Sequence, residues 1–169
     1  MKTTLYMAVS ADGFIARPDD STPWSDEEWE AFLGEVRSVG NMIIGRRTYE
    51  KILSDSGNFH DYGEAVIVVV SGEVRKSDSN VTFVSSHKEA IRFLENEGFS
   101  KALIAGGATL NASFLTSGLV NELVLDVEPK LLGSGLRLFT GEIVERDLRL
   151  DNIRKLSEQS VQLRYSVVK

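Results

Sequence analysis

The segment AVIVVVS, from Ala65 to Ser71, limits the possible folds more than any other stretch of the sequence. Its apolar residues follow one another without the polar residue at every second position that marks a strand with one face in water. Such a run is typical of a strand that is covered on both faces, as strands are in parallel α/β sheets. We therefore expect a central, mainly parallel sheet with helices on both sides.

The segments around this run alternate between strand and helix patterns and fill one domain, residues 1–169. We expect strands at residues 5–9, 42–44, 81–84, 101–105 and 119–127, and helices from the Ser25 cap to Gly40 and at 48–53, 86–97 and 108–115. Residues 14–16 return to the core, and residues 147–168 alternate enough to predict two antiparallel strands at one edge. The predicted fold is thus α/β in three layers, with antiparallel C-terminal strands.

The first helix carries the clearest start signal. Glu28 stands three residues after Ser25, which is the spacing of a capping box. The apolar residues that follow recur at helical spacing and predict a stripe that faces the core, and we expect Trp29 to be a core residue. The members of this stripe are Trp29, Phe32, Leu33 and Val36.

Composition excludes several classes of function. The chain has no cysteine, so it has no disulfide and no thiolate metal site, and it fits a reducing, cytoplasmic environment. A net charge of −6 argues against binding to nucleic acid or to an anionic membrane surface. The N-terminus does not resemble a secretory signal. The two histidines, His60 and His87, show no metal-ligand spacing, so we expect no metal site.

Three predicted strands end on glycine signals, at Gly45, at Ser71-Gly72 and at Gly106-Gly107. In open α/β sheets, ligands lie beyond the carboxyl ends of the strands. Glycine lets backbone N–H groups approach an anion there, and the start of a helix adds a positive dipole. Three such turns in one domain favour a nucleotide site.

Two arginines follow the first of these turns. The forked guanidinium groups of Arg46 and Arg47 suit a phosphate. The alternative is that one is solvated and the other pairs with Glu50 or Asp55. Thr48 could cap the next helix or donate to a phosphate. Standard phosphate motifs are missing, since the chain has neither GxxxxGK[ST] nor GxGxxG, and it also lacks GxSxG.

The motifs together resemble the dihydrofolate reductase-like superfamily, and most closely the branch that contains the pyrimidine reductase domain of riboflavin biosynthesis. In chain order they are MAVSADGFIA, WSDEEWEAF, IIGRRTYE, VVVSG and IAGGATLNASFLTSGLVNELVLDVEPKLLGSGLRLF. The resemblance implies a three-layer dihydrofolate reductase-like domain that binds NADPH across the strand ends and transfers hydride to a small substrate. It also implies a homodimer.

The resemblance assigns residues to the cofactor. The turn from Gly45 to Thr48 would receive the adenosine side with its 2′-phosphate, Ser71 and Gly72 would lie near that phosphate or the adenine, and the turn after residue 105 would hold the pyrophosphate. The segment from Ala8 to Ile15 would border the nicotinamide. The implied cofactor residues are Ala8, Ile15, Gly45, Arg46, Arg47, Thr48, Ser71, Gly72, Gly106, Gly107, Ala108 and Thr109.

The proton donor is less clearly marked. Glu28 best matches the carboxylate that dihydrofolate reductases carry on the first helix, with Asp26 or Glu27 as alternatives, and all three acids could instead simply favour a helix start. Asp12 matches the aspartate of the S-x-D-G segment in that branch, which would place it toward the substrate. The alternative is that it only forms a turn with Gly13.

The substrate side is also implied by the resemblance, through Trp24, Phe32 and Tyr49. Pyrimidine reductases commonly have a glutamate just before the glycine pair, whereas this chain has Ala105. We therefore predict an NADPH-dependent reductase for a small, pterin- or pyrimidine-like heterocycle. The alternatives are the 5-amino-6-ribosylamino-pyrimidine reductase of the riboflavin pathway and a non-catalytic NADPH-binding module.

Overall fold

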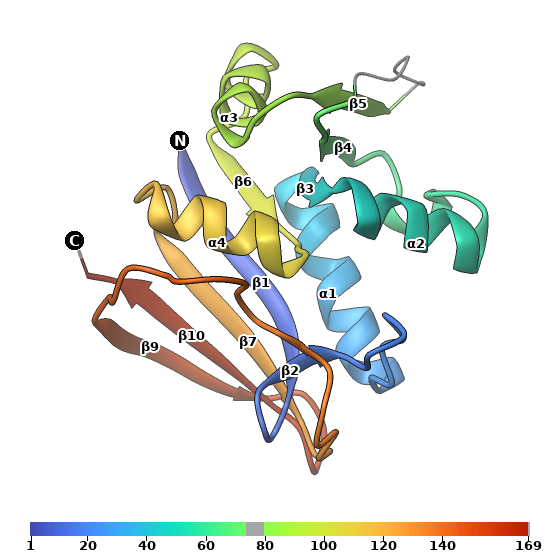
Figure 1. Ribbon diagram of the computed structural model, residues 1–169, viewed down its shortest axis with the longest axis vertical. Helices are drawn as coiled ribbons and strands as arrows, with labels where there is room; N and C mark the ends of the chain where they lie inside the picture. The colour runs from blue at the N-terminus through green and yellow to red at the C-terminus, as the bar shows by residue number, and fades with distance from the viewer. Residues whose placement is uncertain (74–79, 169) are drawn as a thin grey trace.

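The computed structural model describes residues 1–73 and 80–168 and contains an eight-stranded sheet in the order β5-β4-β3-β6-β1-β7-β10-β9 (Figure 1). Its strands are β1 (Lys2–Ser10), β3 (Asn41–Gly45), β4 (Val66–Val70), β5 (Val81–Val84), β6 (Lys101–Ile104), β7 (Glu122–Glu128), β9 (Leu148–Lys155) and β10 (Val161–Val167). A second sheet pairs β2 (Phe14–Ala16) with β8 (Leu136–Arg137). The six strands from β5 to β7 are parallel, and β10 and β9 are antiparallel to their neighbours. The predicted sheet is therefore confirmed.

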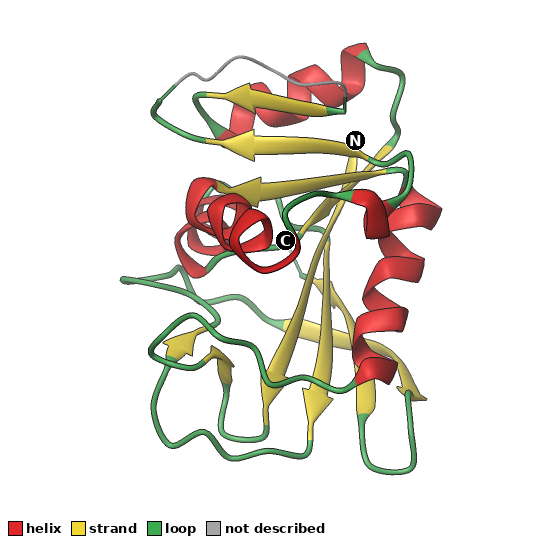
Figure 2. Ribbon diagram, turned by 90° about the vertical axis from the view of Figure 1, so that its right-hand side faces the viewer, coloured by secondary structure: helices red, strands yellow, loops and turns green. Residues whose placement is uncertain are grey.

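Helices cover both faces of this sheet, as Figure 2 shows from the side. Helices α1 (Asp26–Val39) and α2 (Arg46–Ser56), with the short 3-10 helix η1 (His60–Tyr62), pack on one face. Helices α3 (His87–Asn96) and α4 (Ala108–Thr116) pack on the other. The longest, α1, has 14 residues, and among the described residues no helix is both long and apolar enough to cross a membrane.

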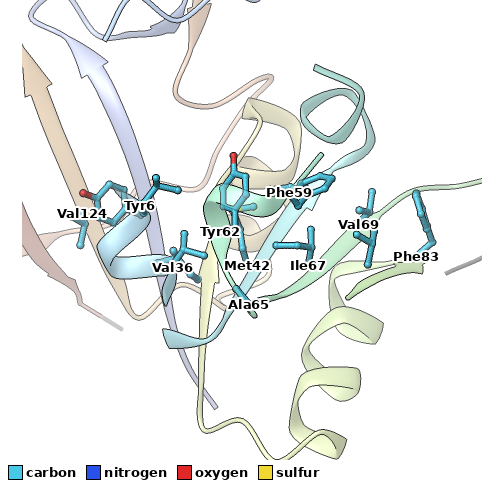
Figure 3. Close-up of a cluster of buried hydrophobic side chains, with 14 residues drawn as sticks. Tyr6, Val36, Met42, Phe59, Tyr62, Ala65, Ile67, Val69, Phe83 and Val124 are labelled. Atoms are coloured by element: carbon cyan, nitrogen blue, oxygen red, sulfur yellow. The ribbon is translucent and has the colours of Figure 1, made fainter. Parts of the chain in front are cut away.

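Strand β4 occupies the position that its apolar run predicts. Ile67 and Val69 face the core under α1 and α2, part of which is drawn in Figure 3. Val68 faces the core under α3 and α4. All three side chains are fully buried, so the run is apolar because both of its faces are covered.

The first helix begins and ends as predicted, but one member of its stripe lies elsewhere. Ser25 caps α1 by accepting a hydrogen bond from the Glu28 N–H group, and Gly40 ends the helix at a φ of 78°. Trp29 is 39% exposed, so the prediction that it belongs to the core is wrong. Its ring makes a T-shaped contact with that of Tyr62, and the neighbouring residue Glu28 is buried instead.

Two predicted boundaries shift. Helix α2 begins at Arg46 with Gly45 as its N-cap, so the prediction that Thr48 caps this helix is wrong. Arginine is a good helix former, which lets the helix start directly after the glycine. The strand predicted from residue 119 begins at Glu122, because the Leu119 N–H group still donates to the Phe114 carbonyl at the end of α4.

Candidate functional site

The glycine turns after β3 (Gly45) and after β6 (Gly106 and Gly107) meet at one corner of the molecule, the glycine corner. The Gly45 N–H group donates to the Gly106 carbonyl oxygen at 2.8 Å, and the Gly106–Gly107 peptide bond is cis. Gly45 and Gly107 are the N-caps of α2 and α4. Glycine has no side chain to accept from the first N–H groups of a helix, so both helices present these donors to a ligand at the same corner.

The same corner has little room for side chains. Gly106 has a φ of +89°, and a Cβ atom on it would lie 3.2 Å from the Sδ and Cε atoms of Met7. A Cβ atom on Gly107 would lie 3.5 Å from the Thr48 Oγ1 atom. Thr48 therefore faces the glycine pair from the first turn of α2, where its hydroxyl group can donate to an anion.

The two arginines stand at the start of α2, each in an exposed ion pair. Arg46 contacts Glu50 at 3.1 Å, which is one of the partners expected for it. Arg47, with its side chain 74% exposed, contacts Asp20 at 3.0 Å, a partner that the sequence did not suggest. Asp55 pairs instead with Lys51. Exposed pairs of this kind contribute little, so both guanidinium groups can turn to a phosphate at small cost.

The turn after β4 lies beside this corner, because Val70 is the register partner of Gly45. Ser71 is buried, and its hydroxyl oxygen accepts from the Glu73 N–H group at 3.0 Å. This bond shapes the turn around Gly72. Ser71 and Gly72 therefore lie next to Gly45 at the same edge of the sheet, on the side of β4 and β5.

The remaining cofactor positions fall on different sides of β1. Ile15 packs with Val9 and Ala108 next to the start of α4, so the structure brings it close to the glycine corner. Ala8 lies one residue from Val9 on the strand and therefore faces the opposite side, toward α1. Thr109 is exposed, and its Oγ1 atom accepts from the Thr140 hydroxyl group at 3.2 Å.

Glu28 is the one buried acid of the three at the start of α1; its side chain is 4% exposed, whereas Asp26 and Glu27 are exposed. It does not complete the capping box. The Ser25 N–H and hydroxyl groups donate instead to Glu128 at 2.9 and 3.0 Å. Among the described residues, no group donates a hydrogen bond to the Glu28 carboxyl group. Burial raises its pKa to about 8, and the nearby carboxylates of Asp126 and Glu128 contribute.

A polar network is buried next to Glu28, on the face of the sheet that α1 covers. The Tyr6 hydroxyl group donates to Asp126 Oδ2 at 2.5 Å, and Gln162 Nε2 donates to Asp126 Oδ1 at 2.9 Å. Gln162 Nε2 also lies 3.1 Å from the Tyr6 hydroxyl oxygen. Burial raises the pKa values of Tyr6 and of Asp126 above their usual ranges.

This network and Glu128 were not predicted from the sequence. One signal was available, because Asp126 and Glu128 interrupt the apolar segment LVLDVEP at alternate positions. Residues at this spacing share one face of a strand. Two acids on a face that must be buried indicate a site rather than a solvated edge.

Asp12 is engaged with the backbone. It accepts from the Ser10 hydroxyl group at 2.6 Å and from the N–H groups of Leu132 and Gly133 at 3.1 and 2.7 Å. These bonds, led by that of Ser10, lower its pKa to about 2. Asp12 therefore carries a negative charge and joins the β1–β2 turn to the loop after β7.

The aromatic residues assigned to the substrate differ in their contacts. Phe32 is half-buried, and its ring centroid is 5.4 Å from that of Tyr6 and 5.8 Å from that of Trp29. Trp24 is also half-buried, next to Ser25. Tyr49, on α2, stacks on Phe59 and packs against the same core cluster as Phe32.

A cleft of about 440 Å³ opens beside the Ser25–Glu128 contact, between the start of α1, the end of β7 and the β9–β10 turn. Its polar lining carries more acids than bases: Ser25, Glu27, Glu128, Pro129, Lys130, Ser157, Glu158, Gln159 and Ser160.

The described residues show no arrangement of three His, Cys, Asp or Glu side chains that could hold a metal ion. His87 contacts the Ser113 hydroxyl oxygen at 2.7 Å through Nδ1 and that of Ser117 at 3.0 Å through Nε2. These contacts join α3 to α4, away from the glycine corner.

The chain is similar to a known protein family, to a curated relative and to solved structures. The family model described as RibD C-terminal domain matches residues 1–162. The uncharacterized protein YwjB of Bacillus subtilis is 36% identical over 97% of both chains. A solved structure from Shewanella sp. PV-4, assigned to riboflavin biosynthesis, superposes with a TM-score of 0.83 over all of both chains at 23% identity.

The diaminohydroxyphosphoribosylaminopyrimidine deaminase/5-amino-6-(5-phosphoribosylamino)uracil reductase of Thermotoga maritima is a more distant neighbour. It matches with a TM-score of 0.75 and 16% identity, over 99% of this chain but 56% of its own. These structures share the fold, and the family model spans nearly the whole chain. This protein is a member of the RibD C-terminal domain family and has its dihydrofolate reductase-like fold.

Proposed function

We propose that this protein is an NADPH-dependent reductase that transfers a hydride to a small heterocyclic substrate. The observation that carries the proposal is the glycine corner, where the starts of α2 and α4 converge beside Arg46 and Arg47. Backbone donors at Gly107 and the following turn would hold the pyrophosphate, and the arginines would hold the 2′-phosphate. The positive φ of Gly106 and the Met7 side chain beside it both favour glycine at this position, which leaves the backbone there uncovered for the pyrophosphate.

When bound, NADPH would supply the hydride. The chain's own residues would supply the proton and the orientation. Glu28, whose pKa is raised to about 8, holds a proton at neutral pH and can give it to the substrate. Phe32, half-buried beside Tyr6, would pack against the substrate ring, and Trp24 would close the side next to Ser25.

Turnover of a panel of pterins and pyrimidines, followed by NADPH absorbance, tests the proposal. Reduction of one of them that is lost in Glu28→Gln supports it. NADPH binding without reduction of any substrate would favour a non-catalytic NADPH-binding module. The control is Glu27→Gln, which removes an exposed acid one residue away.

The riboflavin-pathway reductase is a second candidate, favoured by the family match and by the activity named for the Thermotoga neighbour. That activity concerns a phosphorylated substrate, whereas the cleft beside Glu128 is lined by more acids than bases. Comparing the phosphorylated and dephosphorylated pyrimidines as substrates separates this candidate from the broader proposal.

The arginine pair predicts cofactor choice. NADPH should bind about tenfold or more tightly than NADH, since charge-assisted bonds to a 2′-phosphate are worth roughly 1.5–3 kcal/mol each. Fluorescence titration measures both dissociation constants. Arg47→Ala should reduce the preference, while Arg37→Ala, on α1, should not. Equal constants for the two cofactors in the wild-type protein would contradict the assignment.

We also propose that the protein is a homodimer that pairs through β9, which Figure 1 shows at the edge of the sheet, away from the four helices. Leu148, Leu150 and Ile153 are 43%, 48% and 60% exposed. Their register partners on β10 are Val167, Tyr165 and Leu163, so they share one face. The same apolar surface continues into a groove of about 130 Å³ lined by Ile143, Val144 and Leu148, among others. A second copy related by a two-fold axis would cover this surface with its own equivalent.

Sedimentation at micromolar concentration tests this pairing. The wild-type protein should sediment as a dimer. Ile153→Lys should give a monomer, because it places a charge in the apolar face. Asn152→Lys adds the same charge at the adjacent position, on the other face, and should remain dimeric. A monomeric wild-type protein is the result that would rule the pairing out.

A further inference from the structure

The buried carboxyl group of Asp126 is held in a way that fits its charged form. Both of its oxygens accept hydrogen bonds, one from Tyr6 and one from Gln162. Gln162 also donates to the Tyr6 oxygen, which directs the Tyr6 proton toward Asp126. An ionised carboxylate is an acceptor at both oxygens, whereas a protonated one would have to find an acceptor. Burial opposes the charge, but the directions of these bonds favour it.

Glu128 is satisfied in the same way. Its two oxygens accept from the Ser25 N–H and hydroxyl groups, and the residue is 1% exposed. Glu28 is thus the one member of the three that has no donor among the described residues. Three negative charges in a largely buried site disfavour one another, so the proton goes to the carboxyl group without a donor.

We propose that Asp126 is a positioning residue: fixed by Tyr6 and Gln162, its carboxylate keeps a proton on Glu28 until the substrate takes it. The inference rests on the proposed reductase function. Hydride from NADPH would add to the carbon of a C=N bond, and the π electron pair would move to the nitrogen. The nitrogen would then take the proton as the Glu28 O–H bond breaks, with NADP⁺ as the oxidised product. Glu28 would regain a proton from solvent.

The charged and titratable groups that act on Glu28, or on its neighbours Tyr6 and Asp126, come from four elements. Tyr6 belongs to β1, and Asp126 and Glu128 belong to β7. Arg154 on β9 acts on Asp126 and opposes the rise of its pKa, and Glu35 on α1 acts on Tyr6. Of these, Asp126 contributes most to the raised pKa of Glu28 after burial itself.

The test is the titration of the Glu28 carboxyl group, followed by the carbon resonance of labelled glutamate in the protein without ligand, with Glu28→Gln to assign the signal. The wild-type midpoint should lie near pH 8. Asp126→Asn should lower it by about one unit or more, because it removes the nearby charge and keeps an acceptor for Tyr6. Asp126→Ser also removes the charge and offers a hydroxyl group to Tyr6. It replaces Asp126→Asn in the test if the asparagine variant does not fold.

Glu122→Gln is the matched control, because Glu122 lies on the same face of β7 but pairs with Lys2 and Arg164. It should leave the midpoint unchanged. The decline of kcat at high pH should shift with the midpoint in Asp126→Asn. A wild-type midpoint near that of free glutamate, a midpoint that Asp126→Asn does not move, or a kcat profile that does not follow it overturns the inference. Absence of turnover with every substrate, together with the expected titration, counts against the reductase function instead.

Discussion

Replacing Glu28 by glutamine is expected to stabilise the protein at pH 8, and the gain should shrink as the pH falls toward 4.5. The folded-state pKa of Glu28 is raised from 4.5 to about 8, so between these values the folded protein holds a proton that the unfolded chain releases. The wild-type free energy of unfolding therefore falls as the pH rises through this window, by about 1.4 kcal/mol per pH unit at most. Glutamine does not ionise and escapes this loss, which totals roughly 5 kcal/mol over the whole window.

Urea unfolding at several pH values measures the difference. The curves of the two proteins should separate between pH 4.5 and 8 and run parallel above it. Glu27→Gln, which removes the exposed acid one residue earlier, should keep the wild-type slope. Parallel curves for Glu28→Gln and the wild type across the whole range would show that the Glu28 carboxyl group is not held protonated.

Gly106→Val should raise the dissociation constant for NADPH at least about a hundredfold, which corresponds to the loss of one or two charge-assisted hydrogen bonds. A β-branched residue at a φ of +89° is strained, and its Cβ atom would lie 3.2 Å from Met7. The backbone that forms the corner with Gly45 would have to move. Calorimetric titration with NADPH measures the effect, and circular dichroism checks that the fold is kept.

Gly98→Val is the matched control. Gly98 has a nearly equal φ of +86° at the end of α3, and a Cβ atom on it would have no described neighbour within 4 Å. Both variants should lose a similar roughly 1–3 kcal/mol of stability from the backbone conflict. Only Gly106→Val should lose the cofactor. Equal NADPH affinity in the two variants would mean that the glycine pair only shapes a turn.

The order of elements was predictable because burial on both faces leaves a visible pattern. Val66 to Val70 could be nothing but a covered strand, and Gly40 ended α1 at the predicted residue. The glycine turns were equally predictable, because a glycine that follows an apolar run can be read directly from the sequence. The fold and the position of the glycine corner therefore follow from local signals.

The acid site was only partly predictable, because its members owe their state to partners far along the chain. Glu28 has the spacing of a capping box, yet Glu128 takes that role from 103 residues away. Glu28 is buried and Trp29 is exposed, which the spacing of apolar residues along α1 did not indicate. Asp126 was hidden for the same reason, since its donors Tyr6 and Gln162 come from β1 and β10, near the two ends of the chain.

The bond from Gln162 to the Tyr6 hydroxyl group spans 156 residues, and the clamp between Ser25 and Glu128 spans 103. Contacts of such long range form late in folding, because the entropy of closing the intervening loops must first be overcome. An intermediate in which β10 is not yet paired with β7 would hold the Asp126 carboxylate in an apolar layer without its amide donor. Such a state is unfavourable, so docking of β10 and closure of the layer under α1 should occur as one cooperative step. Amide hydrogens of β7 and β10 should then exchange with solvent at a common rate. Those of β4 and β5 do not belong to this step, and their exchange rate can differ.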